Sequence, residues 1–377
     1  MNKITFFHFA DLHLDTSFRT LASKPGLPAL RRKSLFEGLS LLIEKARTER
    51  PQYLFISGDL FEHEYTGLRT ISAVNGLFSS VPDTKIIMIA GNHDPEAANS
   101  YYRTYKWAGN VWFIGGDRNS IYFDDTNTEV FGLGWVSGTG QAAGLSNMDV
   151  KNDRINVLLF HGDIDLQIGS RDYNSISSAL LKSKGFNYVA AGHNHKKKEG
   201  ESGGVFFNPG SLEPLGFDEP GIHGFFSGII YKNSPPLAEF RNNSTVLYET
   251  IELDISEYNQ NQQIIDALNT LLKPEGSLYK IVLIGNKQID FSPDTAIIEN
   301  EFINKTLFVK VRDKSKVLIS IEELSLMKGL KGIFTRTILE QMEDADEDDK
   351  ILLEKALYYG IESIDSGKIR RAGGEDI

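Results

Sequence analysis

The chain has 377 residues, of which 41% are apolar, with 12 prolines and no cysteine, a composition typical of a folded globular protein. The lack of cysteine excludes disulfide scaffolds, thiolate zinc sites and cysteine nucleophiles, and no stretch approaches the roughly 18 apolar residues of a membrane helix. The net charge of −11 argues against a nucleic-acid partner for the chain as a whole, but the charge is uneven, because residues 340–349 are strongly acidic whereas 31–33 and 196–198 are basic.

Short apolar segments alternate with helical patterns through the first two thirds of the chain, which predicts an α/β fold. Ile4–Phe9 predicts a strand, and an apolar stripe from Leu35 to Ala46 predicts a helix that ends before Pro51. Further strands are predicted at residues 53–57, 85–90, 130–133, 156–160 and 188–190. His8 and Asp11 interrupt the N-terminal apolar stretch too early for a signal peptide, so we expect a cytoplasmic protein with no membrane partner.

The pattern changes after residue 245. Residues 246–320 hold a predicted helix at 259–272 and predicted strands at 279–284 and 307–311, which indicates a small α+β domain. The remainder, 321–377, contains two helical stretches joined by the acidic run. We therefore predict three parts with boundaries at 1–245, 246–320 and 321–377.

Five of the eight histidines fall in short blocks with aspartate, asparagine or glycine. Each block begins at or just past the C-terminal end of a predicted strand, and that edge of an α/β sheet is where ligands collect. The blocks are Asp11-Leu12-His13, Gly58-Asp59, Gly91-Asn92-His93-Asp94, His161-Gly162 and Gly192-His193-Asn194-His195.

Imidazole, carboxylate and amide ligands suit a divalent ion such as manganese, iron or zinc. Two such ions about 3.5–4 Å apart can clamp the attacking and leaving oxygens of a phosphoryl displacement. Asp11 and His13 are two residues apart and can face one ion, while Asp59 can bridge two. The second ion can take Asn92 and His161, and His193 and His195 can be divided between the ions.

His93 lies beside a ligand position without having to be a ligand. Asp94 follows it, and a histidine oriented by a carboxylate is the usual form of a general acid or of a cation that stabilises a charged transition state. We expect Asp94 to raise the pKa of His93 and the metals to lower it.

A single histidine in a strand or turn is more often structural than a ligand, and this interpretation is kept for His8, His63 and His223. For the other five histidines we favour a functional role, because a purely structural explanation would require the same pattern to arise by chance in five separate blocks.

The five blocks resemble the signature of the calcineurin-like metallophosphoesterase superfamily. Gly58-Asp59-Leu60-Phe61, the Asn208-Pro209-Gly210-Ser211 turn and the Gly216-Phe217-Asp218-Glu219 segment resemble the SbcD-type DNA repair nucleases, and within them the YhaO-like group. Protein serine/threonine phosphatases differ, because they carry Asp-Arg-Gly and glutamate where this chain has Phe61-Glu62 and Asp94.

The resemblance implies a four-layer β-sandwich flanked by helices, with a smaller α+β capping domain and a helical C-terminus. It assigns one manganese to Asp11, His13, Asp59 and His195, and the other to Asp59, Asn92, His161 and His193. His93 would assist the transition state, with Asp94 orienting it. The nuclease branch often has a second histidine directly after Gly-Asp-Leu-Phe, where this chain has Glu62, and His63 follows one position later.

The resemblance also implies a homodimer, an SbcC-like coiled-coil ATPase partner and a capping domain that positions DNA. An apolar stripe on the helix predicted from Leu68 to Phe78 suits either a dimer face or ordinary core packing. The C-terminal helices suit either ATPase docking or packing on their own chain.

Basic residues mark two candidate DNA contacts. Lys196, Lys197 and Lys198 follow His195 directly and suit phosphate positioning, with a solvated loop as the alternative. Arg103 lies in the aromatic stretch Tyr101–Trp107, which suits stacking on unpaired bases or packing in the core.

The leading hypothesis is a two-metal DNA phosphodiesterase, an exonuclease or endonuclease of the double-strand-break repair type, in which metal-bound hydroxide attacks phosphorus in line and His93 assists. One alternative is a phosphodiesterase for small nucleotides or cyclic dinucleotides, which would not need the appended domain and the basic loops. The other is a non-catalytic scaffold subunit, against which the complete set of ligand positions argues.

Overall fold

A computed structural model describes residues 2–116, 118–136, 144–145, 148–164, 175–199, 204–273, 276–288, 291–317 and 320–366. The chain divides into two compact units. The first holds residues 1–249 with 275–278 and 306–308, and the second holds 250–274, 279–305 and 309–377.

One six-stranded sheet of the first unit begins with the N-terminal strand. Its order is β14 (Leu237–Asn242), β13 (Gly224–Tyr231), β1 (Lys3–Phe9), β2 (Tyr53–Ser57), β3 (Lys85–Ile89) and β4 (Val111–Phe113). β1 to β4 are parallel, and β13 is antiparallel to both β1 and β14. The parallel strands are nearly continuous apolar runs because both of their faces are buried.

A second six-stranded sheet packs against the first. Its order is β11 (Lys198–Glu199), β12 (Phe206–Asn208), β10 (Tyr188–Gly192), β7 (Ile155–His161), β6 (Thr128–Leu133) and β5 (Ser120–Phe123). The four inner strands are parallel, and the two edge strands are antiparallel to their neighbours. Side chains from both sheets form the apolar layer between them, including Phe6, Phe55, Ile87, Val157, Leu159 and Tyr188.

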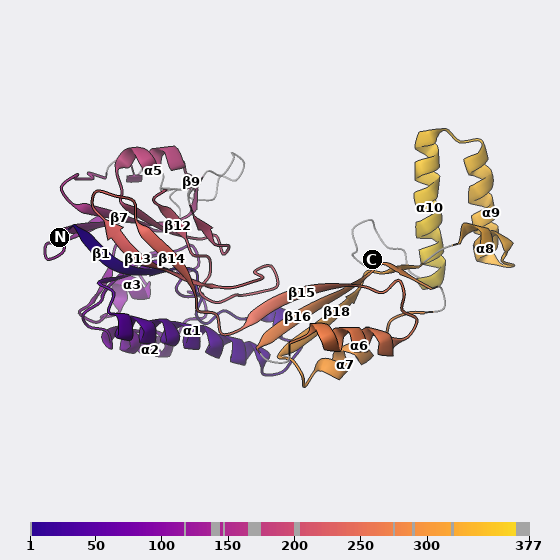
Figure 1. The fold of residues 1–377 in the computed structure, drawn as a ribbon, viewed down its shortest axis with the longest axis horizontal. Coiled ribbons are helices and arrows are strands. Elements are labelled where there is room, and N and C mark those ends of the chain that lie inside the picture. The colour runs from indigo at the N-terminus through magenta and orange to yellow at the C-terminus, as the bar shows by residue number, and fades with distance from the viewer. Residues whose placement is uncertain are drawn as a thin grey trace. The chain divides into compact units, whose positions relative to one another are not determined.

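Helices cover the outer faces of both sheets (Figure 1). α1 (Leu27–Glu49) and α2 (Leu68–Ser79) share an apolar cluster with the first sheet, and α5 (Ser178–Lys184) shares one with the second. The predicted α/β class with two large sheets flanked by helices is therefore confirmed. Shorter elements of this unit are η1 (Arg19–Leu21), α3 (Tyr101–Thr104), β8 (Asp163–Ile164) and β9 (Ser175–Ile176).

The apolar stripe of α2 packs into the core. Ile71, Val74 and Phe78 are fully buried in the cluster shared with α1 and the first sheet. Leu68 is exposed. Of the two interpretations of this stripe, core packing holds for its three buried members, and a homodimer stays a prediction.

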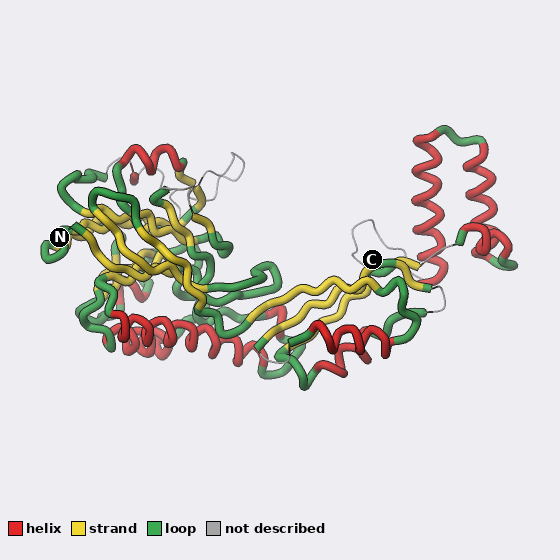
Figure 2. Tube along the Cα trace, in the orientation of Figure 1, coloured by secondary structure: helices red, strands yellow, loops and turns green. Residues whose placement is uncertain are grey.

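The second unit is built on a three-stranded sheet with two helices packed against it (Figure 2). The strands are β15 (Leu247–Asp254), β16 (Ser277–Ile284) and β18 (Phe308–Asp313), and the helices are α6 (Asn261–Leu271) and α7 (Thr295–Phe302). A capping box of Gln260 and Gln263 starts α6, and the Asp294 side chain caps α7. β17 (Asn286–Lys287) and β19 (Lys316–Val317) form a short parallel pair.

Three helices follow: α8 (Ile321–Leu326), α9 (Leu330–Glu343) and α10 (Glu347–Ser366). They share a small apolar cluster of Leu324, Ile338, Leu357 and Ile361. The acidic run joins α9 to α10 and places Glu347, Asp348 and Asp349 in the first turn of α10, where negative charge favours a helix. The predicted boundaries at 245 and 320 stay a prediction. Within the described part of the chain, no helix is long and apolar enough to span a membrane.

Candidate metal centre

The five blocks lie at the carboxyl ends of β1, β2, β3, β7 and β10, which are neighbours within their sheets. The loop after β1 is tied to the loop after β2, because the N–H groups of Leu12 and His13 both donate to the carbonyl of Asp59, at 2.9 and 3.0 Å. His161 is the last residue of β7, and Gly192 is the last residue of β10. Parallel strands thus bring residues 182 positions apart, such as His13 and His195, to one edge.

Four candidate ligands adopt backbone conformations that are rare for residues other than glycine. The φ angles are 52° at Asp11, 51° at His13, 49° at Asp59 and 94° at His193. Such conformations cost about 1–3 kcal/mol each and persist where the surrounding structure enforces them, commonly at active sites. Their concentration in these loops indicates that the direction of these side chains is maintained at a cost in backbone conformational energy.

Two glycines make room for the side chains. Gly58 has φ of 88°, and a Cβ atom at this position would overlap the ring of His161. A Cβ atom at Gly91 would overlap the carboxylate of Asp59. Both positions therefore require glycine for close approach.

All seven predicted ligands gather in two adjoining clusters. In the first, Asp11, His13 and His195 present ligand atoms within 4.8 Å of one another, and the Nε2 atoms of the two histidines are 3.1 Å apart. In the second, Asp59, His161 and His193 are grouped in the same way. The Oδ1 atom of Asn92 lies 2.9 Å from both His161 Nε2 and His193 Nδ1.

Asp59 lies between the clusters. Its Oδ2 atom is 3.3 Å from His161 Nε2 in the second cluster and 3.6 Å from His13 Nε2 in the first. One carboxylate therefore faces both groups, as a bridging ligand must.

Each of the four histidines in the two clusters has an oxygen atom near one of its ring nitrogens. His13 Nδ1 lies 2.9 Å from Glu62 Oε1, and His195 Nδ1 lies 2.6 Å from Glu219 Oε1. His161 Nδ1 lies 2.8 Å from the carbonyl of Ser57, and His193 Nε2 lies 3.6 Å from Asp163 Oδ2. Metal-ligating histidines characteristically donate their other ring N–H to such acceptors, which aims the remaining nitrogen lone pair at the ion. The donor set therefore fits two divalent ions.

The charges of the clusters lead to the same conclusion. Burial alone would raise the pKa of Asp59, but the His161 imidazole holds it well below its usual range. Burial would lower the pKa of His161, but Asp59 raises it to about 9, and the hydrogen bond to Glu219 likewise raises the pKa of His195 to about 9. The buried carboxylates thus favour positive charge at these positions, and a divalent ion supplies that charge while displacing protons from the histidines.

His93 stands at the exposed side of the centre and is oriented by Glu62. The side chain of His93 is 46% exposed, and its Nδ1 atom lies 3.1 Å from Oε1 of Glu62 and 3.2 Å from Oε2. The hydrogen bond to Glu62 raises the pKa of His93, against the effect of burial, and Asp59 raises it further.

The expectation that Asp94 orients His93 is wrong. The Oδ1 atom of Asp94 accepts from the backbone N–H groups of Asp59 and Gly91, and Oδ2 accepts from Phe61 N–H and the Tyr102 hydroxyl. The buried Asp94 side chain therefore links the loop after β2 to the loop after β3, and none of these hydrogen bonds involves the His93 ring. Burial, reinforced by Asp59, raises the pKa of Asp94 to about 7.

Sequence reasoning gave no metal-site role to Glu62, Asp163 or Glu219. Each had a signal: Glu62 departs from the family pattern, Asp163 follows the His161 block, and Glu219 ends a segment already noted. Which histidine each carboxylate serves depends on long-range contacts that spacing does not encode.

The three histidines assigned structural roles lie outside the two clusters. His8 is buried, bonded to Tyr188 and Ser57, and burial lowers its pKa to about 3. His223 is buried and bonded to Ser211 and to the carbonyl of Glu219. The backbone N–H of His63 donates to the carbonyl of His93.

The candidate DNA contacts have different surroundings. Lys196, Lys197 and Lys198 are exposed, with Lys197 paired to Glu199 at 3.6 Å and lying over the ring of Phe240. Arg103 is bound to Glu96 through two of its nitrogens, which leaves less of its guanidinium for phosphate.

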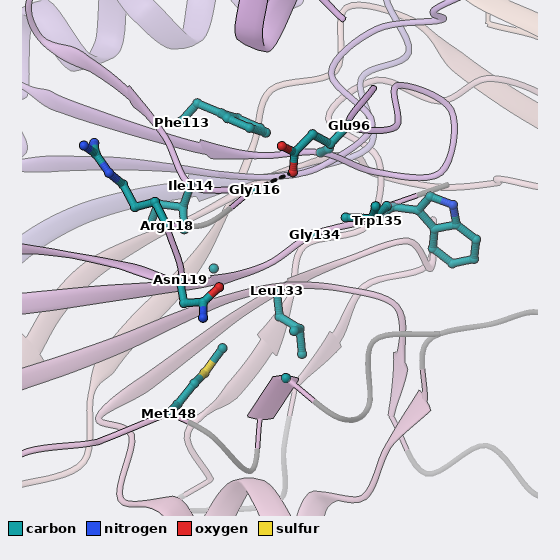
Figure 3. A pocket seen from close by; sticks show the side chains of 15 residues that line it. Glu96, Phe113, Ile114, Gly116, Arg118, Asn119, Leu133, Gly134, Trp135 and Met148 are labelled. Atoms are coloured by element: carbon teal, nitrogen blue, oxygen red, sulfur yellow. Dashed lines mark hydrogen bonds between the residues drawn. The ribbon is translucent and has the colours of Figure 1, made fainter. Parts of the chain in front are cut away.

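Glu96 also accepts from the backbone N–H of Gly116 and lines a cavity of about 230 Å³ (Figure 3). The described residues that line this cavity include Ile114, Leu133 and Met148 and none of the seven predicted ligands. The rings of Tyr102 and Trp107 pack with Phe61, so this part of the aromatic stretch belongs to the core.

Residues 4–197 match the model of the family described as calcineurin-like phosphoesterase, which is more than half of the chain. The matched segment includes all five blocks.

Three curated proteins are similar over longer stretches. The chain is 23% identical over 294 residues to a protein named uncharacterized metallophosphoesterase YhaO from Bacillus subtilis, covering 74% of this chain and 70% of that protein. It is 28% identical over 230 residues to the DNA double-strand break repair protein Mre11 of Methanococcus maripaludis, covering 57% of this chain and 58% of that protein. It is also 28% identical over 275 residues to the Mre11 of Methanopyrus kandleri, covering 66% of this chain and 57% of that protein. The chain thus spans less than two thirds of the length of either Mre11 protein.

Proposed function

The chain belongs to the calcineurin-like phosphoesterase family, and from this premise we propose that it is a two-metal phosphodiesterase that cleaves DNA. The observation that carries the proposal is the pair of ligand clusters that share Asp59, with His93 on the exposed side. Phosphodiester hydrolysis at such a centre requires a site for the phosphate and a group that handles a proton or stabilises negative charge.

The ligand residues would hold two divalent ions, for which manganese is our proposal and iron or zinc the alternatives. Asp11, His13, Asp59 and His195 would hold one ion, and Asp59, Asn92, His161 and His193 the other. When bound, the ions activate a water molecule and offset the charge on the phosphoryl oxygens.

Three side chains of the protein, Glu62, His93 and Asp94, would have the other roles in the reaction. Glu62 orients the His93 ring and favours its protonated form, so that the ring would offer a hydrogen-bond donor to a bound phosphate. His93 would donate to the leaving oxygen or stabilise the charge that develops on the phosphate. Asp94 acts indirectly, because it secures the loops that carry Asp59 and Gly91.

DNA is proposed as the substrate on three supports. Two relatives are named as DNA double-strand break repair proteins. The chain carries a second folded unit beyond the matched family segment. Lys196, Lys197 and Lys198 follow ligand His195 directly and are exposed, as phosphate-positioning groups must be.

Two partners are proposed as well. Leu326, Leu330 and Leu352 of the C-terminal helices are exposed by 82%, 68% and 65%, so these apolar side chains are available for contact with a partner. We propose that they dock a coiled-coil ATPase of the SbcC type and that the protein is a homodimer. Co-purification with such an ATPase should be lost in Leu330→Glu and Leu352→Glu, and light scattering should give twice the chain mass.

The substrate proposal is tested with purified protein and Mn²⁺ on four substrates: linear duplex DNA, single-stranded DNA, a cyclic dinucleotide and bis-p-nitrophenyl phosphate. Degradation of DNA that stops with EDTA supports it. Cleavage of the cyclic dinucleotide or of bis-p-nitrophenyl phosphate with DNA left intact would favour the small-substrate alternative. Inactivity on all four with both metals bound would favour the scaffold.

A further inference from the structure

Arg31 of α1 is a buried arginine of the first unit. Its side chain is completely buried, and one guanidinium nitrogen, Nη2, donates to the carbonyl of Pro214 at 2.8 Å. Nε and Nη1 have no hydrogen-bond partner among the described residues. The guanidinium also lies over the rings of Phe18 and Tyr248, at 5.3 and 5.5 Å from their centroids.

Burying a guanidinium in this way lowers the stability of the folded state. A buried charge with few hydrogen bonds is commonly less stable than an apolar residue of similar volume. Glu213, also fully buried, is near enough for the Arg31 charge to oppose the rise that burial causes in the Glu213 pKa, but among the described residues the two side chains form no ion pair within 4.0 Å. Positions that break the rules of stability in this way are typical of functional requirements.

The carbonyl that accepts from Arg31 belongs to a peptide group with a second partner. The Pro214–Leu215 peptide presents its C=O to Arg31, and its N–H, on Leu215, donates to Glu219 Oε2 at 3.1 Å. The other oxygen of Glu219, Oε1, lies 2.6 Å from Nδ1 of His195. A single peptide group therefore separates the buried cation from the carboxylate that holds a candidate metal ligand.

The charges along this path favour the same orientation of the peptide, because the cation lies at its C=O and the carboxylate at its N–H. A cation at the carbonyl end polarises the peptide and strengthens its N–H as a donor to the carboxylate, since hydrogen bonds in series reinforce one another in a low-dielectric interior. Ser211 Oγ donates to the same Oε2 atom at 2.6 Å, so both donors hold one oxygen and leave Oε1 directed at His195.

We propose that Arg31 is a positioning residue for His195, acting through the Pro214–Leu215 peptide and Glu219. The proposal deepens the metal-dependent function and rests on it for its purpose, because an aligned His195 matters only if that ring holds an ion. Arg31 touches neither ion nor substrate. Its effect is to hold the loop at Glu219 in the one position that aims the His195 ring.

The test uses the full chain and the Mn²⁺ affinity, measured from the electron paramagnetic resonance signal of free Mn²⁺. The variants are Arg31→Lys, Glu219→Gln and the double variant. Arg154→Lys is the control, because Arg154, like Arg31, lies over an aromatic ring, that of Tyr122, but its guanidinium pairs with Glu129 at 2.9 Å and not with the Pro214–Leu215 peptide.

Glu219→Gln should weaken one Mn²⁺ by about 10- to 100-fold, the range for groups that hold a metal ligand. Arg31→Lys should weaken the same ion by on the order of 3- to 10-fold, as an indirect contact does. The double variant should bind within about 2-fold of Glu219→Gln alone, since both changes break one path. Arg154→Lys should leave the affinity unchanged.

The second measurement is the nitrogen NMR spectrum of His195 in the metal-free protein. Arg31→Lys should shift the Nδ1 signal of His195, and Arg154→Lys should not. Two results would overturn the inference: a lower melting temperature for Arg31→Lys with neither affinity nor His195 signal changed, or effects of the two single variants that multiply in the double variant. If the wild type binds no pair of ions but Arg31→Lys still shifts His195, the metal-dependent function fails while the positioning role holds.

Discussion

Glu62 Oε1 lies 3.1 Å from Nδ1 of His93, and the same oxygen lies 2.9 Å from Nδ1 of His13. One carboxylate thus serves the exposed histidine of the centre and a candidate ligand of the first cluster. His93 and the first cluster are thus joined at Glu62.

Glu62→Gln should lower the pKa of His93. The hydrogen bond to the Glu62 carboxylate is the largest effect raising that pKa, so neutralising the carboxylate lets His93 lose its proton at lower pH. Proton NMR titration of the metal-free protein measures this directly. Asp94→Asn serves as the comparison and should move the His93 titration less, because Asp94 does not face the ring; a larger shift in Asp94→Asn would contradict the assignment.

His93→Ala should abolish phosphodiester cleavage while two Mn²⁺ ions still bind. The His93 ring is not one of the seven predicted ligands, although it forms a third group of possible ligands with His13 and Glu62. Its loss should therefore remove a positioned acid or cation worth about 10²- to 10⁴-fold in rate. Turnover of DNA or bis-p-nitrophenyl phosphate gives the rate, and metal analysis gives the stoichiometry. Loss of metal together with activity would make His93 a ligand instead.

Asp59→Asn should reduce the bound metal below two ions per chain. Its Oδ2 atom faces both clusters, and an amide in its place offers one neutral oxygen. Elemental analysis after gel filtration measures the stoichiometry. Asp125→Asn is the control, because Asp125 is exposed and pairs with Lys85. Two tightly held ions in Asp59→Asn would show that this carboxylate does not bridge.

Glu213→Gln should stabilise the protein above neutral pH. Burial raises the pKa of Glu213 from 4.5 to about 7, so the folded state retains a proton that the unfolded state releases above pH 4.5. Wild-type stability therefore falls as pH rises from about 4.5 to about 7, by up to ~3 kcal/mol, and stays lower at higher pH. The melting temperature of Glu213→Gln should exceed that of wild type at pH 8 and match it near pH 4.5. The exposed Glu252→Gln should show no such difference, and an equal response of both variants would refute the prediction.

Replacing Lys196, Lys197 and Lys198 by alanine should weaken DNA binding at every sequence and flatten its salt dependence. Each lysine that contacts a phosphate contributes about 0.7–0.9 to the slope of log affinity against log salt. Fluorescence anisotropy at several salt concentrations measures the slope. Arg32→Ala with Lys33→Ala, in the other basic run, should leave it unchanged. An unaltered slope in the triple variant would show that these lysines do not contact DNA phosphates.

Much of the fold was predictable because its signals are local. The strands at 53–57, 85–89 and 188–192 are uninterrupted apolar segments, and such segments predict buried parallel strands from composition alone. The gathering of Asp11, Asn92 and His193 followed from their positions at strand ends, since the carboxyl ends of parallel strands share an edge.

The partners of the site residues were not predictable in the same way. Adjacency in sequence suggested Asp94 for His93, but neighbouring side chains point in different directions, and a residue 31 positions away, Glu62, fills that role. Arg31 belongs to a basic run of the sequence, residues 31–33, but its side chain is buried, because helix α1 turns that one position of the three toward the core.

The sequence by itself determined which donor groups are available to the candidate metal centre, because their types and order are contained in five short blocks. Only the tertiary structure decided which carboxylate holds which histidine. The physical reason is that side-chain direction is set by left-handed backbone conformations at Asp11, His13 and Asp59 and by contacts between loops far apart in the chain.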